Sequence, residues 1–361
     1  MGFLPVTRNE LEKSGCSQAD VILASADAYI DSPYSAVAIL GHVLVKAGYS
    51  VAVLSQPDVS DIDEFREFGQ PRLFWGVCCG CVDAMVANYT ASGKKRKQDD
   101  FTPGGINNRR PDRVAIQYTN AIRQAFKEKK PVVIGGIEAS LRRIAHYDFW
   151  SDKVRRSVVC DAKADAVLYG MGERIIAEFA AAVADGKDWR NLDGVCYMAP
   201  EKNFVPPAGA IELPSFMEVS APTKEGKAAF ARAFKIFSEN QDPATARTLL
   251  QKTDNRYLVH NRPAKVLDEK ELDEIYSTRW MLDAPPAIRK KGDIRALDTL
   301  RFGITTHRGC YGQCNFCAIA VHQGRRIVSR SEKSIVEEAR RKLDENKMKV
   351  AQLEKLAKLF A

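Results

Sequence analysis

The segment "DAVLYGMGERIIAEFAAAVADG", residues 165–186, holds a complete strand-to-helix unit. Its first part is short, apolar and ends in glycine, and its second part has the spacing of an amphipathic helix. A strand that is apolar along its whole length is buried on both faces, as in a parallel sheet covered by helices on either side. The segment therefore predicts one unit of a doubly wound α/β fold.

The same alternation extends through the first 200 residues of the chain. In one of the units, Ser35 is a suitable N-cap for a helix that stops near Gly48. The apolar segments interpreted as strands are residues 20–30, 51–57, 72–80, 131–137 and 165–172, and those with helical spacing are residues 35–50, 111–130 and 173–186. We therefore expect residues 1–200 to form an N-terminal doubly wound parallel sheet.

Composition limits the class of protein only broadly. The chain has 361 residues, enough for two or three domains, and a formal charge of +8, which permits a nucleic-acid partner without requiring one. Its nine cysteines are odd in number and sparse, so a disulfide framework is not expected. We find no apolar run long enough to span a membrane and no secretory signal, which favours a cytoplasmic protein that uses grouped cysteines for metal or redox chemistry.

Several polar features have both a functional and a structural interpretation. Glu138 and Glu173 each follow glycines at the end of a predicted strand, where a ligand would bind or where a tight turn would simply start a helix. Residues 140–159 mix aromatic side chains with paired arginines and His146, as a substrate-facing surface or a ring-packed loop would. Residues 93–112 contain a "KKRK" run followed by two aspartates, and we expect a solvated loop there.

The chain changes character after residue 200. Residues 201–298 contain proline-rich stretches, two predicted helices at 223–240 and 268–280, and one predicted strand at 256–261, so we expect a connecting region that wraps around the sheet. Residues 299–310 then resemble a strand that leads into a cysteine-rich loop, and residues 329–346 a helix that begins near Ser331 or Ser334. The tail has apolar residues at roughly helical spacing, which predicts an amphipathic helix in need of a partner: Leu343, Val350, Leu353, Leu356 and Phe360.

The loop "THRGCYGQCNFCAIAVHQGRR", residues 306–326, places Cys310, Cys314 and Cys317 in a C-x3-C-x2-C pattern. A structural zinc site needs four protein ligands, and His307 or His322 could supply the fourth. A four-iron cluster normally takes four thiolates, so three would leave one iron open to an outside ligand. Both kinds of metal stay open on the spacing alone.

The cysteine pattern, with the aromatic Phe316 before its last cysteine, resembles the signature of radical S-adenosylmethionine (radical SAM) enzymes. The resemblance implies that the three cysteines hold a [4Fe-4S] cluster whose open iron chelates S-adenosylmethionine, and that Phe316 lies near the adenine. It also implies reductive cleavage of the cofactor to a 5′-deoxyadenosyl radical, fed by an external electron donor. His322, Gln323 and Arg325, close to the loop, become candidates for contact with cofactor or substrate.

Longer motifs resemble the YgiQ family of radical SAM proteins over residues 20–335. These motifs are "DAYID", "TPGG", "RPDR", "IGGIEASLRR", "YGMGER", "QDP" and "HRGC". The resemblance implies a cobalamin-binding-like α/β domain over residues 1–200, a connecting region over 201–298, and the start of a radical SAM (β/α) barrel over 299–361. Cobalamin itself is unsupported, because the D-x-H-x-x-G signature of some cobalamin proteins is missing. The substrate stays unknown.

Two features depart from that family. Cys78, Cys79 and Cys81 form a "CCGC" group, which is either a second metal or redox site or a set of small apolar residues at a strand end. A full (β/α)₈ barrel needs about 250 residues, so residues 299–361 would form only an incomplete, truncated barrel. We therefore expect either a fragment of a longer chain or one piece of a split enzyme whose barrel a partner chain completes. The alternative to an enzyme is a non-catalytic fragment or binding module whose cysteine loop holds zinc or a cluster.

Overall fold

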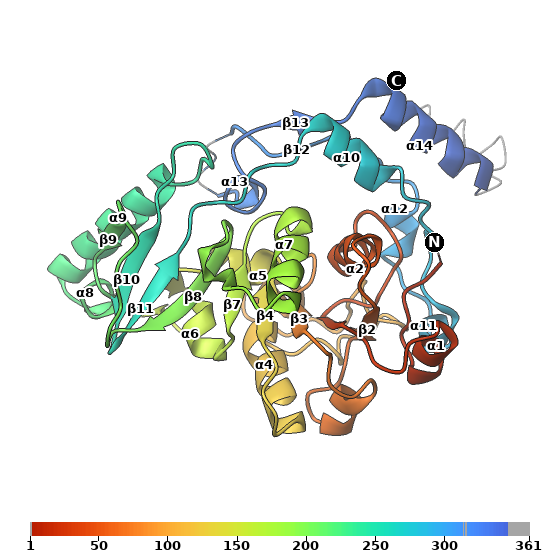
Figure 1. Cartoon of the computed structure of the whole chain (residues 1–361), viewed down its shortest axis with the longest axis horizontal. Helices are drawn as coiled ribbons and strands as arrows, with labels where there is room; N and C mark the ends of the chain where they lie inside the picture. Colours follow the sequence, from red (N-terminus) through yellow and green to blue (C-terminus); the bar gives the residue numbers. More distant parts are fainter. Residues whose placement is uncertain (1, 313, 315, 346–361) are drawn as a thin grey trace.

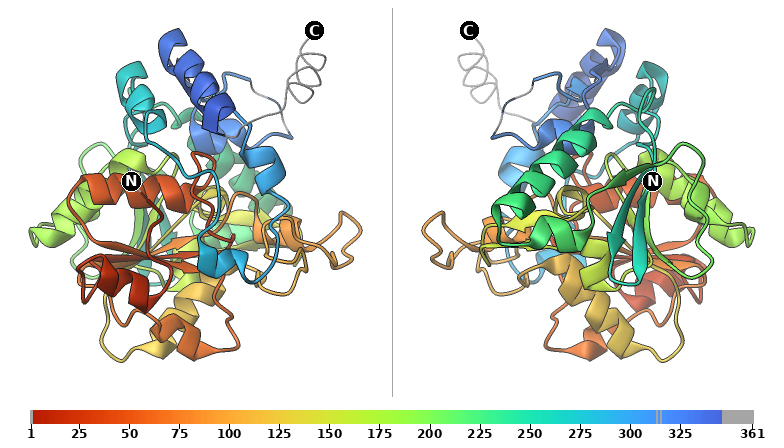
Figure 2. Two further views of the ribbon diagram at one scale, coloured as in Figure 1. Left: turned by 90° about the vertical axis from the view of Figure 1, so that its right-hand side faces the viewer. Right: turned by 90° about the vertical axis from the view of Figure 1, so that its left-hand side faces the viewer.

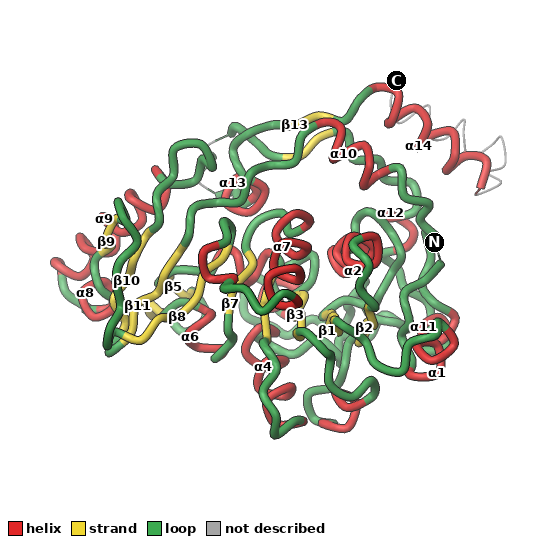
Figure 3. The backbone as a smooth tube through the Cα atoms, in the orientation of Figure 1, coloured by secondary structure: helices red, strands yellow, loops and turns green. Residues whose placement is uncertain are grey.

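A nine-stranded sheet forms the centre of the computed structural model, which describes residues 2–312, 314 and 316–345 (Figures 1 and 3). Its strand order is β2-β1-β3-β4-β7-β8-β11-β10-β9. The bounds are β1 Val21–Ser25, β2 Val51–Ser55, β3 Phe74–Cys78, β4 Val132–Gly135, β7 Ala166–Leu168, β8 Val195–Pro200, β9 Ile211–Leu213, β10 Leu249–Thr253 and β11 Arg256–His260.

The first five strands of this order are parallel and confirm the predicted large, mostly parallel sheet. Val21 of β1 pairs with Val51 of β2 on one side and with Phe74 of β3 on the other. If only the strands of this sheet are counted, the order is 2-1-3-4-5, as in flavodoxin-like doubly wound folds. The carboxyl ends of β1, β3, β4 and β7 therefore share one edge, which we call the ligand edge.

Helices cover both faces of the parallel strands, as the continuous apolar strands predict. Along β1, Leu23 packs into the core under α2 and α7, whereas Ile22 packs into the core under α4 and α6. Alternate residues of a strand point to opposite faces, so each strand feeds both cores. The helix bounds are α2 Ala36–Lys46, α4 Val114–Ala125, α6 Val158–Ala162 and α7 Glu173–Ala184.

Part of the expected connecting region extends the sheet. The predicted strand at 256–261 is confirmed as β11, which pairs antiparallel with both β8 and β10. Strands β8, β9 and β10 are additional to the prediction, and helix α9, Lys224–Glu239, packs its buried Phe237 against this half of the sheet. Shorter helices are α1 Arg8–Lys13, α3 Ala84–Asn88, α5 Ile137–Leu141 and α8 Phe216–Ser220, with 3-10 turns at Ile62–Arg66 and Trp189–Asn191. The domain boundaries stay predictions.

The prediction of a strand over residues 299–310 is wrong for most of its length. Residues Leu297–Leu300 form helix α12, because Leu297 is buried in the core beside α2 and α7 and a helical turn places it there. Only β12, His307–Arg308, is extended, and it pairs antiparallel with β13, Val328–Ser329, in a separate two-stranded sheet. The expected start of a barrel is therefore not confirmed.

The remaining C-terminal elements lie together above the ligand edge (Figure 1). They are α10 Glu269–Tyr276, α13 Ile319–Gln323 and α14 Glu332–Glu345. Helix α11, Pro286–Arg289, lies between α10 and α12 in the chain. Ser331 accepts a hydrogen bond from Ser334 N (3.1 Å), which confirms it as the residue before α14. Of the predicted tail helix, Leu343 is exposed, and residues 346–361 lie outside the described residues. Among the described residues, no helix combines the length and apolarity needed to cross a bilayer.

The loop of residues 93–112 protrudes from the sheet in both side views (orange in Figure 2). Its "KKRK" run, Lys94–Lys97, is exposed, as expected of a solvated loop. Its second half differs, because Asp99, Thr102 and Arg110 are buried. Only half of this loop is therefore solvated.

Candidate functional site

The cysteine loop connects β12 to α13, and its start is braced against the end of α13. Cys310 N donates to Gly324 O (3.1 Å), and Gly309 N donates to the side-chain Oε1 of Gln323 (3.1 Å). Gly309 has φ +84°, and a Cβ there would overlap the backbone of Arg326. Only glycine fits that position, so the backbone before the first cysteine is closely held against the backbone after α13.

Two of the three thiols approach one another around Gly312. A Cβ at Gly312 would lie 3.3 Å from Cys310 Sγ and 3.7 Å from Cys314 Sγ, so glycine leaves the space between these sulfurs free. Cys317 N donates to Cys314 O (3.1 Å), which turns the chain after the second cysteine. Three thiols in this spacing are a suitable donor set for an iron–sulfur cluster with one open iron.

The geometry of that donor set is incomplete. Among the described residues, no group of three or more His, Cys, Asp or Glu side chains is arranged to hold a metal ion. Phe316 is 92% exposed, so it is available to cover a ligand, and its predicted place near the adenine stays a prediction.

Helix α13 docks on the ligand edge between the ends of β4 and β7. Ser140, in α5, accepts a hydrogen bond from Gly170 N (3.1 Å), and its Oγ lies 3.0 Å from His322 Nδ1. Burial, together with the nearby charge of Arg143, lowers the pKa of His322 to about 4. The imidazole is therefore neutral at pH 7, and its tautomer decides whether His322 Nδ1 or Ser140 Oγ donates the hydrogen.

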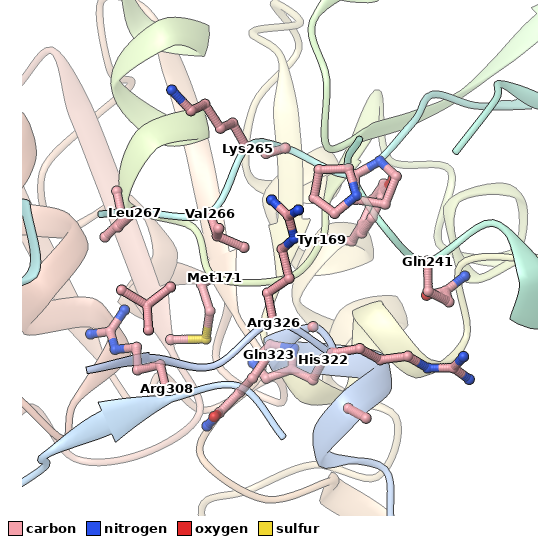
Figure 4. Close-up of a pocket in the computed structure, with 18 of the residues that line it drawn as sticks. Tyr169, Met171, Gln241, Lys265, Val266, Leu267, Arg308, His322, Gln323 and Arg326 are labelled. Carbon is pink, nitrogen blue, oxygen red and sulfur yellow. The ribbon is translucent and has the colours of Figure 1, made fainter. Parts of the chain in front are cut away.

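A pocket lies beside α13, between it and the segments that follow β7 and β11 (Figure 4). Its cavity volume is about 80 Å³, and the space around it is open to solvent. His322, Gln323 and Arg325 all line it, so the structure brings these three candidates together. Met171 follows β7, and Lys265, Val266 and Leu267 follow β11, whose carboxyl end lies at the same edge.

Arg143 forms part of the pocket wall and was not singled out by the sequence. Only 1% of it is exposed, and its guanidinium donates to His260 Nε2 (2.9 Å) and Gln241 Oε1 (2.7 Å) and stacks over the Tyr169 ring at 4.5 Å. Burial lowers the pKa of Arg143, and it also lowers the pKa of His260 well below its usual value. The "SLRR" stretch and its aromatic neighbours indicated a polar surface or a ring-packed loop in the sequence, but only the fold shows that Arg143 is the enclosed arginine.

The two carboxylates at strand ends have different surroundings. Glu138 accepts from Ala84 N (3.2 Å) and Ala115 N (3.1 Å), and burial raises its pKa, which is a structural role at two helix starts. Glu173 pairs with Arg308 next to the pocket, so it holds β12 against the start of α7. Both glutamates thus hold the structure together, and Glu173 also lies next to the pocket through its partner Arg308.

The remaining histidines of the sequence prediction lie apart from the pocket lining. His146, in the hairpin of β5 His146–Asp148 and β6 Lys153–Arg155, has Nδ1 3.2 Å from Ile144 O, and burial lowers its pKa to about 4. His307 is exposed, with Nδ1 2.9 Å from Thr306 Oγ1. His322 is engaged by Ser140 at Nδ1, and the role of His307 or His322 as a fourth zinc ligand stays a prediction.

The "CCGC" group is divided by the sheet. Cys78 belongs to the core on the α2 and α7 side, whereas Cys79 belongs to the core on the α4 side. Burial raises the pKa of Cys78 to about 12 and that of Cys79 well above its usual value, so both thiols stay protonated. They fill space as small apolar residues, and Cys81 is exposed beyond the strand end.

The crevice between the ends of β1 and β3, where doubly wound folds bind ligands, is filled by the chain itself. Arg110 pairs with Asp27 (2.6 Å) and Asp99 (3.0 Å), and Gln56 donates to Thr102 Oγ1 (2.9 Å). No histidine is among these described residues, and the space holds a buried ion-pair network. These residues do not fit a cobalamin bound in the crevice.

Comparison with known proteins places the chain in a class. A family model described as Radical SAM N-terminal matches residues 3–303, which covers the nine-stranded sheet and stops before the first cysteine of the loop. Curated relatives include UPF0313 protein FN0734 of Fusobacterium nucleatum, 48% identical over 341 residues, and a UPF0313 protein of Thermotoga maritima, 46% identical over 341 residues. Both matches cover 94% of this chain and 59% of the relative.

The chain therefore has a radical SAM N-terminal domain. More specifically, it belongs to the UPF0313 family, the YgiQ-like radical SAM proteins, which confirms the family that the motifs resemble. It spans 59% of the length of these two relatives. Among solved structures, radical S-adenosylmethionine methyltransferase TsrM from Kitasatospora setae, with cobalamin and a [4Fe-4S] cluster bound, aligns at 19% identity and a TM-score of 0.45, covering 89% of this chain and 45% of TsrM.

Proposed function

We propose that this chain binds a [4Fe-4S] cluster through Cys310, Cys314 and Cys317 and binds S-adenosylmethionine at the iron left open by the three thiolates. These groups, when bound, supply reductive cleavage to a 5′-deoxyadenosyl radical that abstracts hydrogen from a substrate not yet identified. The observation that carries the proposal is a C-x3-C-x2-C loop, braced at its start against the end of α13, in a member of a radical SAM family.

The chain's own residues position the loop and shield it. Gln323 holds the backbone before Cys310 through Gly309 N, and α13 fixes that brace to the ligand edge through His322. Phe316, exposed next to Cys317, is assigned to the adenine of the cofactor. Gln323 and Arg325 are assigned to contacts with cofactor or substrate from the pocket wall.

The proposal extends to partners. An external electron donor has to reach the exposed cysteine loop, since Cys314 and Phe316 face solvent. We also propose a cytoplasmic location, and we propose that turnover requires a chain segment that completes a barrel over α13 and α14. A binding module with zinc at the cysteine loop, and His307 or His322 as the fourth ligand, is the alternative.

The test is anaerobic loading with iron and sulfide, followed by metal analysis and electron paramagnetic resonance. We expect about four irons per chain and, with dithionite and S-adenosylmethionine, formation of 5′-deoxyadenosine. Cys314→Ser should lose the cluster, whereas the control Cys81→Ser, at another exposed cysteine, should keep it.

The outcomes separate the two functions. Zinc that stays stoichiometric after iron loading, with no iron–sulfur absorbance, would establish the binding module and overturn the radical SAM proposal. Cluster assembly without 5′-deoxyadenosine in this chain, but with it when a longer relative's C-terminal part is added, would place the missing contacts in that part.

A further inference from the structure

The pocket beside α13 has far more positive than negative side chains. Six cationic residues line it, whereas Asp242 is the one acidic residue among the described residues of its lining. The cationic residues are Arg143, Arg174, Lys265, Arg308, Arg325 and Arg326. A cleft lined by one sign of charge focuses its field and attracts ligands of the opposite sign.

Three of these cations are already neutralised by carboxylates of the chain. Arg308 pairs with Glu173, Arg174 pairs with Glu271, and Arg326 lies 3.8 Å from Asp242. These pairs hold α7, α10 and the segment after α9 around the pocket. They leave the charge of the other three cations to be balanced.

Arg143, Lys265 and Arg325 have no carboxylate partner among the described residues. Arg143 is enclosed and bonds only to neutral acceptors, and Arg325 donates to Ser238 Oγ (3.1 Å). Lys265 is exposed at the pocket rim and has no ion pair in the described part of the chain. Because Arg143 is enclosed and its guanidinium is held by neutral acceptors, Lys265 and Arg325 are the cations that an anionic ligand would meet at this pocket.

The other lining residues define the rest of the ligand. Apolar side chains form a continuous share of the wall, among them Met171, Val266, Leu267 and Val321. Figure 4 shows Met171 between Leu267 and the α13 side of the pocket. A pocket with an apolar wall and a few convergent polar groups is typical of a small-molecule site.

We infer that this pocket binds a small organic ligand that carries at least two negative charges, such as a phosphorylated or polycarboxylic compound with an apolar part, and that it is not the site of S-adenosylmethionine. S-adenosylmethionine carries a sulfonium, an ammonium and one carboxylate, so its net charge is positive and the surplus cations disfavour it. The inference deepens the proposed function, since it gives the chemical class of the substrate that meets the cysteine loop across α13.

The experiment is calorimetric titration of the full chain, loaded with iron and sulfide under argon, at low ionic strength. The probes are inorganic pyrophosphate, citrate, adenosine 5′-diphosphate and adenosine. We expect saturable binding of the anions, with adenosine 5′-diphosphate tightest and adenosine undetected. Comparing the dissociation constants of pyrophosphate and citrate then tells whether the pocket prefers phosphates or carboxylates.

A matched pair of variants tests the residues. Lys265→Gln with Arg325→Gln removes two charges from the pocket and should weaken pyrophosphate binding roughly tenfold to a hundredfold. Lys127→Gln with Lys129→Gln removes two exposed charges after α4, at the opposite edge of the sheet, and should leave binding within about twofold. Both variants change surface positions, so both are expected to fold.

The inference is overturned if no anion binds saturably, if both double variants weaken binding equally, or if S-adenosylmethionine competes with pyrophosphate for one site. These results are independent of the metal analysis, because iron content and 5′-deoxyadenosine formation are separate measurements. A chain that binds pyrophosphate through Lys265 and Arg325 but assembles no cluster would retain the anion site and lose the radical SAM proposal.

Discussion

Replacing Gly309 by alanine should disorder the cysteine loop without unfolding the sheet. Gly309 has φ +84°, and the added Cβ would overlap the carbonyl oxygen of Arg326 and lie 2.8 Å from its carbonyl carbon. Both are backbone atoms, so neither can move away by a change of rotamer. The clash must therefore push β12 and β13 apart.

The expected cost follows from two contributions. The positive φ costs an alanine about 1 to 2 kcal/mol, and forcing an extra carbon into a closed contact costs roughly 1 to 3 kcal/mol. Restoring an ordinary carbon–carbon distance of about 3.5 Å to the carbonyl carbon requires a shift of roughly 0.7 Å, and the closer carbonyl oxygen requires a larger one. Because β12 and β13 form their own two-stranded sheet, the loop should open locally before the whole chain loses that much stability.

The assay compares Gly309→Ala with Gly15→Ala, whose φ of +86° is similar but whose Cβ would meet no atom within 4 Å. Both variants should unfold in urea within about 2 kcal/mol of the original chain. Gly309→Ala should take up less than half the iron of the original, with faster amide exchange at Cys310 N, and Gly15→Ala should load normally. Equal iron uptake by the two variants would refute the view that the Gly309 contact holds the thiols in place.

Two further predictions concern stability. Burial lowers the pKa of His146 and of His322 to about 4 and lowers the pKa of His260 well below its usual value. Below about pH 6.5 the unfolded chain therefore binds protons that the folded chain does not, so the free energy of unfolding in urea should fall between pH 6.5 and pH 4. A free energy of unfolding that does not change over this pH range would contradict the assignment. Asp31 is fully buried and accepts hydrogen bonds from His42 Nε2 (2.6 Å), Tyr29 OH and Met281 N. Asp31→Asn places an amide donor against these donors and should lower the free energy of unfolding in urea by about 2 to 4 kcal/mol. A decrease below about 0.5 kcal/mol would contradict the importance of these hydrogen bonds.

The parallel half of the sheet was predictable because its strands are apolar along their whole length. Periodicity of that kind depends only on local sequence, and β1, β2, β3, β4 and β7 all formed where it indicated. The antiparallel half was harder to predict from the sequence, since a strand such as β9 has only three residues and carries the exposed Glu212. Its strands exist because β11 pairs with both β8 and β10, and pairing between distant segments leaves no local pattern.

The site shows the same limit of local information. The thiol spacing and the residues His322, Gln323 and Arg325 were identifiable because they follow one another in the chain. Arg143 was not, because its importance arises from Gln241 and His260, about a hundred residues further along. The wrong strand at 299–310 has a related cause, since its first two residues belong to α12, whose Leu297 is buried in a core built by distant segments.

The ligand edge is divided between two uses, and this division explains where the pocket lies. At the end of β1 and β3, Arg110 and its two aspartates close the crevice with charges that balance within the chain. At the ends of β7 and β11, the cations outnumber the carboxylates and α13 brings the cysteine loop close. A buried cation is tolerated at the first place because its anions are built in, and at the second because neutral acceptors, His260 Nε2 and Gln241 Oε1, hold Arg143. The proposed anion site depends instead on Lys265 and Arg325, at the strands nearest the thiols.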